Sequence, residues 1–93
     1  MSKDQFTWSR NLNQEETLKF ETKMQMLNAA YRHFDAQQAR ARANMQIYLE
    51  TSTGIGEHSD LVEEIVQFVE TITHAEDCKK TLSAIIDEAT KNA

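Results

Sequence analysis

The sequence predicts an all-α protein, a long antiparallel helical hairpin that is expected to dimerise into a four-helix bundle. Two stripes of apolar residues recur at alternating steps of four and three, the spacing that places side chains along one face of a coiled-coil helix. The chain of 93 residues has no proline, and its two glycines both lie between the stripes. Because proline and glycine are the residues that interrupt helices, each stripe is expected to form one unbroken helix.

The first helix is predicted over residues 13–52. The side chain of Asn13 can accept a hydrogen bond from the first turn, and Glu16 completes a capping box. Gly54 can adopt the left-handed conformation that closes the far end of the helix. Gln38 interrupts an otherwise apolar stripe, whose members are Phe20, Met24, Leu27, Tyr31, Phe34, Ala41, Met45 and Tyr48.

The second helix is predicted over residues 59–91. Asp60 and Glu63 form a second capping box, which sets the start at Ser59 or Asp60. Lys79 is the one charged residue within the stripe, and a polar stretch from His74 to Lys80 is compatible with a bend. The apolar members are Leu61, Ile65, Phe68, Ile72, Ala75, Leu82, Ile86 and Ala89.

The connecting turn is predicted over residues 53–58. Its glycines Gly54 and Gly56, followed by His58 near a helix start, resemble a generic phosphate-binding arrangement. Glu57 and Asp60 would repel an anion, and neither a preceding strand nor a Gly-x-x-x-x-Gly-Lys run is present. We therefore interpret the segment as a tight connector.

The second helix carries more apolar surface than one seam can cover. Two long helices packed side by side form a thin rod, and a chain of this size needs a further apolar layer. The additional face comprises Val62, Val66 and Val69, and we predict that it forms the interface of a homodimer. The alternative is a monomer in which residues 1–12 fold back as a third layer.

Residues 1–12 form an N-terminal arm or flap that lacks a clear period. Phe6 and Trp8 are expected to pack on the hairpin, although such a pair is also typical of an anchor for another protein. A second candidate for partner binding is the group Arg32, Arg40 and Arg42 near the middle of the first helix. This group is too small to resemble the basic stripe of a DNA-binding protein.

The charge distribution excludes several classes of partner. Residues 1–50 carry seven Lys and Arg against six Asp and Glu, whereas residues 51–93 carry three against nine. An acidic second helix argues against binding to nucleic acid. No apolar run approaches the roughly 20 residues that cross a bilayer. The single cysteine, Cys78, precludes an intramolecular disulfide, and we expect a soluble protein in a reducing cytoplasm.

Possible chemistry centres on Glu70, His74 and Cys78, which follow one another at one-turn intervals. Zinc requires about four suitable ligands, and a di-iron bundle requires Glu-x-x-His pairs, which this chain lacks. A mid-helix position beside Lys79 and Lys80 does not by itself supply the base and the oriented pocket that would make Cys78 a nucleophile. We therefore expect a polar helix face, no catalytic residue, no bound metal and no cofactor.

Residues 45–72 contain a specific local pattern, in which a tyrosine-leucine helix end precedes a Gly-Ile-Gly-Glu-His turn and an acidic-apolar helix start. The segments are Ile47-Tyr48-Leu49, Gly54-Ile55-Gly56-Glu57-His58 and Asp60-Leu61-Val62-Glu63-Glu64-Ile65. The pattern resembles small uncharacterised helical proteins of T4-like marine phages, which implies a phage source and the host cytoplasm as location. A looser similarity, around residues 62–66, is to the tail-fibre assembly chaperone of T4-like phages.

Two classes of function remain. The first is a non-enzymatic interaction module, a phage accessory or host-interaction factor whose partner is a host or virion protein; an assembly chaperone is a variant of this class. Secreted helical hairpins of Gram-positive bacteria have similar lengths, but the turn here lacks their Trp-x-Gly motif. The second class is a small-molecule or metal-binding bundle that uses Glu70, His74 and Cys78.

Overall fold

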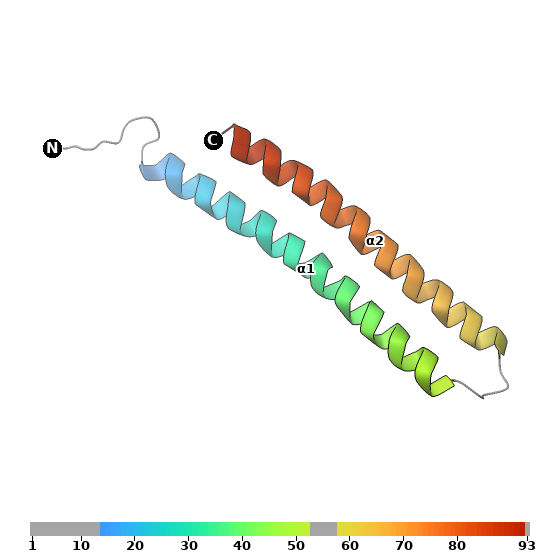
Figure 1. The fold of residues 1–93 in the computed structure, drawn as a ribbon. Coiled ribbons are helices and arrows are strands. Elements are labelled where there is room, and N and C mark those ends of the chain that lie inside the picture. The colour runs from blue at the N-terminus through green and yellow to red at the C-terminus, as the bar shows by residue number, and fades with distance from the viewer. Residues whose placement is uncertain (1–13, 53–57, 93) are drawn as a thin grey trace.

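The computed structural model describes residues 14–52 and 58–92, and the helices in these ranges are α1 (Gln14–Ser52) and α2 (His58–Lys91). The helices run antiparallel and side by side along their length (Figure 1). The prediction of an all-α helical hairpin is confirmed. Asn13, Gly54 and Gly56, on which parts of the capping and turn predictions rest, lie outside the described residues.

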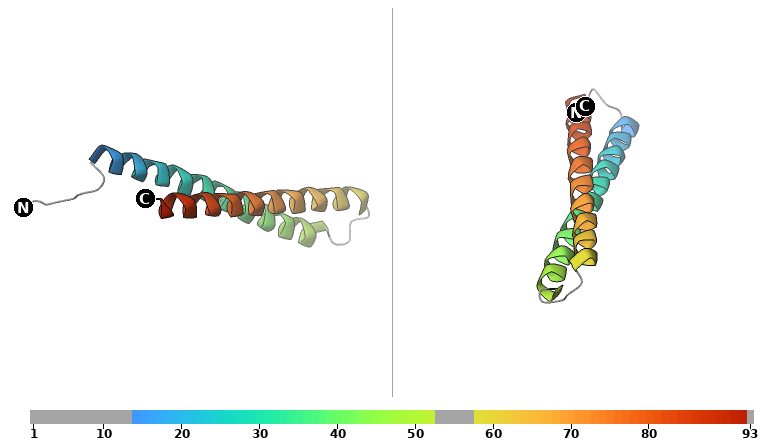
Figure 2. Two further views of the ribbon diagram at one scale, coloured as in Figure 1. Left: turned by 90° about the horizontal axis from the view of Figure 1, so that it is seen from above. Right: turned by 90° about the vertical axis from the view of Figure 1, so that its right-hand side faces the viewer.

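The contact between α1 and α2 follows the two predicted stripes. Residues at stripe positions are buried or half-buried, and most of the residues between them are exposed. Ala41, Ile72 and Ala75 are the most buried apolar residues that the structure describes, and Ala75 is 0% exposed. Figure 2 shows the two helices crossing. Ala41 and Ala75 lie in the seam, and small side chains in a seam allow helix backbones to approach closely.

Aromatic residues pack on either side of this crossing. Toward the turn, the rings of Tyr48 and Phe68 meet edge to face with centroids 6.0 Å apart. Toward the open end, Phe34 approaches the imidazole of His74 with centroids 6.2 Å apart. Edge-on contacts of this kind add modestly to the burial of the rings themselves.

The start of α2 differs from the prediction. The helix begins at His58, so this residue belongs to the first helical turn and not to the connector. Asp60 accordingly lies within the first turn, where its carboxylate favours the positive end of the helix dipole, and is not the cap residue. Helix ends depend on local hydrogen bonding that the sequence specifies weakly. Farther along, α2 continues without interruption through the polar stretch from His74 to Lys80.

The described hairpin is a thin rod, and its longer helix, α1, has 39 residues and is therefore about 58 Å long. A single seam between α1 and α2 therefore provides all of the tertiary packing in the described part of the chain. Neither described helix is long and apolar enough to cross a membrane.

Candidate functional site

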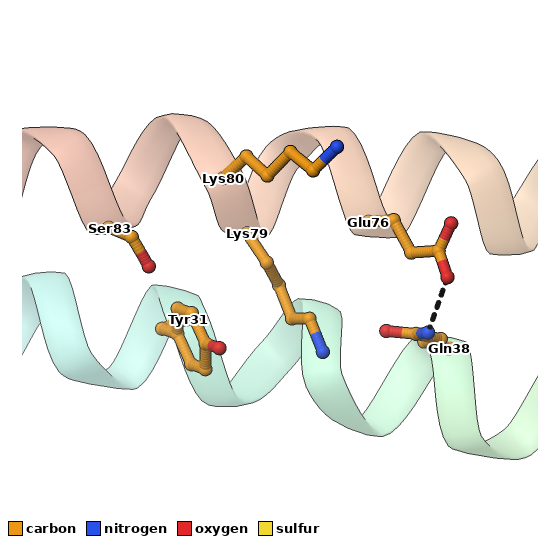
Figure 3. A pocket seen from close by; sticks show the side chains of 6 residues that line it. All are labelled: Tyr31, Gln38, Glu76, Lys79, Lys80 and Ser83. Carbon is orange, nitrogen blue, oxygen red and sulfur yellow. Dashed lines mark hydrogen bonds between the residues drawn. The ribbon is translucent and has the colours of Figure 1, made fainter.

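The two polar interruptions of the apolar stripes, Gln38 and Lys79, line one hollow near the middle of the seam, and each bonds to a side chain of the opposite helix. Nε2 of Gln38 donates a hydrogen bond to Oε2 of Glu76 at 3.0 Å, drawn in Figure 3. Nη2 of Arg42 donates to the same carboxylate oxygen at 3.1 Å. One carboxylate of α2 thus holds two side chains of α1. The sequence marked Gln38 as an interruption but gave no indication of this partner, because the partner depends on the register between the helices.

Lys79, the other interruption, is paired in the same region. Its Nζ donates to Oδ1 of Asp35 at 2.8 Å and lies 5.6 Å from the ring centroid of Tyr31. The hydrogen bond to the Asp35 carboxylate raises the pKa of Lys79 above its ordinary value of 10.5, and the negative charge of Asp35 adds to the effect. The ammonium therefore stays charged although its side chain is largely covered. We call Asp35, Gln38, Arg42, Glu76 and Lys79 the polar layer.

An open hollow of about 500 Å³ adjoins the polar layer and is lined partly by Tyr31, Lys80 and Ser83 (Figure 3). Lys79 and Glu76, which also line it, are already paired with side chains of α1. Two of the three charged residues that line the hollow, Glu76 and Lys79, are therefore satisfied by side chains of α1. This arrangement is suited to fixing the register of the two helices and provides no activated nucleophile or base.

The structure does not bring the three predicted arginines to one surface. Arg42 reaches across the seam to Glu76, as described above. Arg40, two residues earlier, projects roughly 200° away around the helix, because successive residues are about 100° apart. Arg32 and Arg40 are exposed, and within the described ranges neither forms an ion pair. Arg42 thus has a structural contact that the sequence did not reveal.

The three valines of the predicted dimer interface lie on the surface of α2. Val62, Val66 and Val69 are 58%, 48% and 47% exposed. We call them the valine face. Their exposure is high for apolar side chains, and the hairpin by itself leaves them uncovered.

Leu49 of α1 extends the valine face. Arg42 and Glu76 pair across one side of the hairpin, and a residue seven positions along a helix returns to nearly the same side. In this antiparallel pair, the residues seven positions nearer the turn are Leu49 on α1 and Val69 on α2. Leu49 is 41% exposed. The apolar surface therefore spans both helices near the turn.

The predicted metal-ligand set is only partly assembled. Cys78 Sγ lies 3.6 Å from His74 Nε2, as expected for residues one turn apart. Within the described ranges no group of three or more His, Cys, Asp or Glu side chains is placed to hold a metal ion, so Glu70 does not complete a site. His74 and Cys78 instead border an apolar hollow together with Phe34.

Phe6 and Trp8, the remaining residues predicted to bind a partner, lie outside the described residues. Comparisons with protein-family models, with curated proteins and with solved structures find no match. The function must therefore be argued from the surfaces of the hairpin.

Proposed function

We propose that the chain is a non-enzymatic helical interaction module that forms a homodimer through the valine face. The observation that carries the proposal is the exposure of Val62, Val66 and Val69 beside Leu49 on a hairpin with one seam. Soluble monomers seldom leave a contiguous apolar patch uncovered, and such patches typically mark an interface. The dimer would supply the second apolar layer of a four-helix assembly.

The shape of the hairpin supports the presence of a partner. One seam joins α1 and α2 in the described part of the chain, so the outer sides of both helices stay uncovered. A partner on the valine face would add the further apolar layer that a chain of this size needs.

The proposed biological role is contact with a second protein of the host or of the virion, as the resemblance to small phage proteins implies. Arg32 and Arg40, which are exposed on α1, are available for such a contact. An acidic partner surface would complement their charge. Assembly chaperone activity is a variant of this role.

The dimer is tested by measuring the mass of the protein in solution with light scattering over a roughly hundredfold concentration range. Val66→Glu places a charge in the proposed interface and should shift the protein to monomer. Ile47→Glu is the matched control, because Ile47 is 57% exposed on α1. Circular dichroism checks that both variants remain helical.

The outcomes separate clearly. A wild-type dimer that only Val66→Glu dissociates supports the proposal. A wild-type monomer at every concentration, or a dimer that Val66→Glu leaves intact, would show that the valine face is not the contact between copies.

The contact between His74 and Cys78 favours one candidate of a different class, a metal-binding bundle. Since a single chain offers only this pair among the described residues, further ligands would have to come from a second copy. Zinc that remains bound through dialysis and is lost in Cys78→Ser would support this candidate. A protein that emerges metal-free after exposure to zinc would eliminate it.

A further inference from the structure

An apolar groove runs along the open end of the hairpin, on the side opposite the valine face. One hollow, of about 430 Å³, is bordered by Ala30, Phe34 and Leu82, and Cys78 and Ile85 also line it. A second hollow, of about 360 Å³, contains Leu27 and shares Ile85 with the first. We call the two together the end groove.

The positions along α2 show that the end groove and the valine face point in opposite directions. Val69 and Glu76 lie seven residues apart and share one side of the helix, as do Cys78 and Ile85. Cys78 follows Glu76 by two residues, which is roughly 200° of rotation. A dimer formed through the valine face therefore leaves the end groove open.

We propose that the N-terminal arm of the same chain occupies the end groove, with Trp8 beside Leu27 and Ile85 and Phe6 beside Ala30 and Leu82. The arm precedes Gln14, the first residue of α1, and the start of α1 lies at the open end of the hairpin beside the end of α2 (Figure 1). The hollow that contains Leu27 is the nearer of the two to this end. Phe6 and Trp8 are two residues apart, so in an extended segment both side chains project toward the same side. One apolar edge of the arm can thus face the groove.

The length of the arm matches the position of the groove. Along α1, Leu27 lies about 20 Å from Gln14 and Ala30 about 24 Å, at 1.5 Å per residue. An extended chain that doubles back from Gln14 covers about 20 Å to Trp8 and about 27 Å to Phe6, at roughly 3.4 Å per residue. Trp8 therefore reaches the hollow that contains Leu27, and Phe6 reaches the hollow that is bordered by Ala30.

The net charges of the arm and of the groove are opposite. The arm carries Lys3, Asp4 and Arg10, which sum to one positive charge. The groove lining carries Lys23, Asp77 and Glu88, which sum to one negative charge. Opposite net charges favour the docked arm.

The sequence provides two specific probes for the test. Trp8 is the only tryptophan and Cys78 the only cysteine, so tryptophan fluorescence reports the arm alone and thiol alkylation reports the groove alone. In the full-length protein we expect Trp8 emission that is shifted to the blue and protected from acrylamide. Burial of one aromatic side chain favours the docked arm over the undocked arm by roughly tenfold. Trp8→Ala should therefore expose the groove more often and speed the alkylation of Cys78 several-fold.

A matched pair of variants locates the contact. Ile85→Ser removes an apolar side chain from the groove, where Ile85 is 45% exposed, and Ile47→Ser makes the same change on the more exposed Ile47 of α1. We expect Ile85→Ser to shift Trp8 emission to the red and to raise its quenching, and Ile47→Ser to leave both unchanged. Circular dichroism confirms that both proteins keep their helices.

Three results would overturn the proposal. Solvent-exposed Trp8 emission in the wild-type protein would show that the arm does not dock. Buried emission that Ile85→Ser leaves unchanged would place Trp8 elsewhere. Burial that weakens on dilution would assign the groove to a second copy of the chain. None of these readouts depends on the valine face, so Val66→Glu tests the dimer separately.

Discussion

The difference in stability between two Ile→Ala variants tests whether the single seam holds the fold. Ile72 is 7% exposed and Ile47 is 57% exposed. The same substitution therefore removes the same atoms from a buried position and from an exposed position. Both residues lie within long helices, and the change in helix propensity therefore cancels in the comparison. The difference between the variants isolates the contribution of burial.

The structure sets the expected magnitude. Full burial of an isoleucine side chain contributes roughly 1.5–3 kcal/mol, and the two sites differ by half of this burial. The cavity left at Ile72 adds a further cost, which the neighbouring side chains of a thin seam can partly relieve. We expect Ile72→Ala to lower the free energy of unfolding by about 2 kcal/mol more than Ile47→Ala does.

Urea denaturation followed by circular dichroism measures this difference. For a chain of this size, the thermal midpoint should differ by roughly 8–16 °C between the variants. Equal destabilisation by the two substitutions would contradict the reasoning, since it would mean that Ile72 is no better covered in solution than Ile47.

Two further predictions concern the polar layer. Oε1 of Gln38 is buried with no hydrogen-bond partner in the described structure, whereas its Nε2 bonds to Glu76, which Arg42 also holds. Gln38→Leu removes the unpartnered oxygen and this bond together, so it should change the free energy of unfolding by less than about 1 kcal/mol; a loss of several kcal/mol would contradict this. Because the folded-state pKa of Lys79 lies above its ordinary 10.5, the stabilisation from its pairing with Asp35 is fully present below that value and is lost as the pH rises through the raised pKa. The difference in urea midpoint between the wild type and Asp35→Asn should therefore be present near pH 8 and shrink as the pH is raised above 10.5; a difference that does not change with pH would refute the assignment.

The hairpin itself could be predicted from the sequence because both stripes obey one spacing rule over most of their length. Residues such as Met24 in α1 and Phe68 in α2 are half-buried where that rule places them. The exposure of Val66 was expected for the same reason, since its position falls outside the stripe. Local periodicity thus accounts for which side of each helix is covered.

The polar layer could not be predicted, because its contacts depend on the register between the helices. Glu76 bonds to Gln38 and Arg42, which precede it by 38 and 34 residues. The period of one helix carries no information about its alignment with the other. The three arginines were grouped by their proximity in the sequence, and the ion pair of Arg42 with Glu76 could not be inferred for the same reason.

The polar layer also determines where the interaction surfaces lie. If α2 slipped by one heptad along α1, the apolar stripes would still face each other, but Glu76 would leave Gln38 and Arg42, and Lys79 would leave Asp35. Gln38 is partly buried and Lys79 is largely covered, so losing their partners costs more than the modest gain from forming the bonds, whereas the more exposed Asp35, Arg42 and Glu76 contribute little. The native alignment is therefore favoured over an apolar seam that tolerates both registers. That alignment places Leu49 beside Val69 at the turn and Leu27 beside Ile85 at the open end. The polar layer, which takes no direct part in binding, thus positions the valine face and the end groove, the two surfaces that we propose take part in binding.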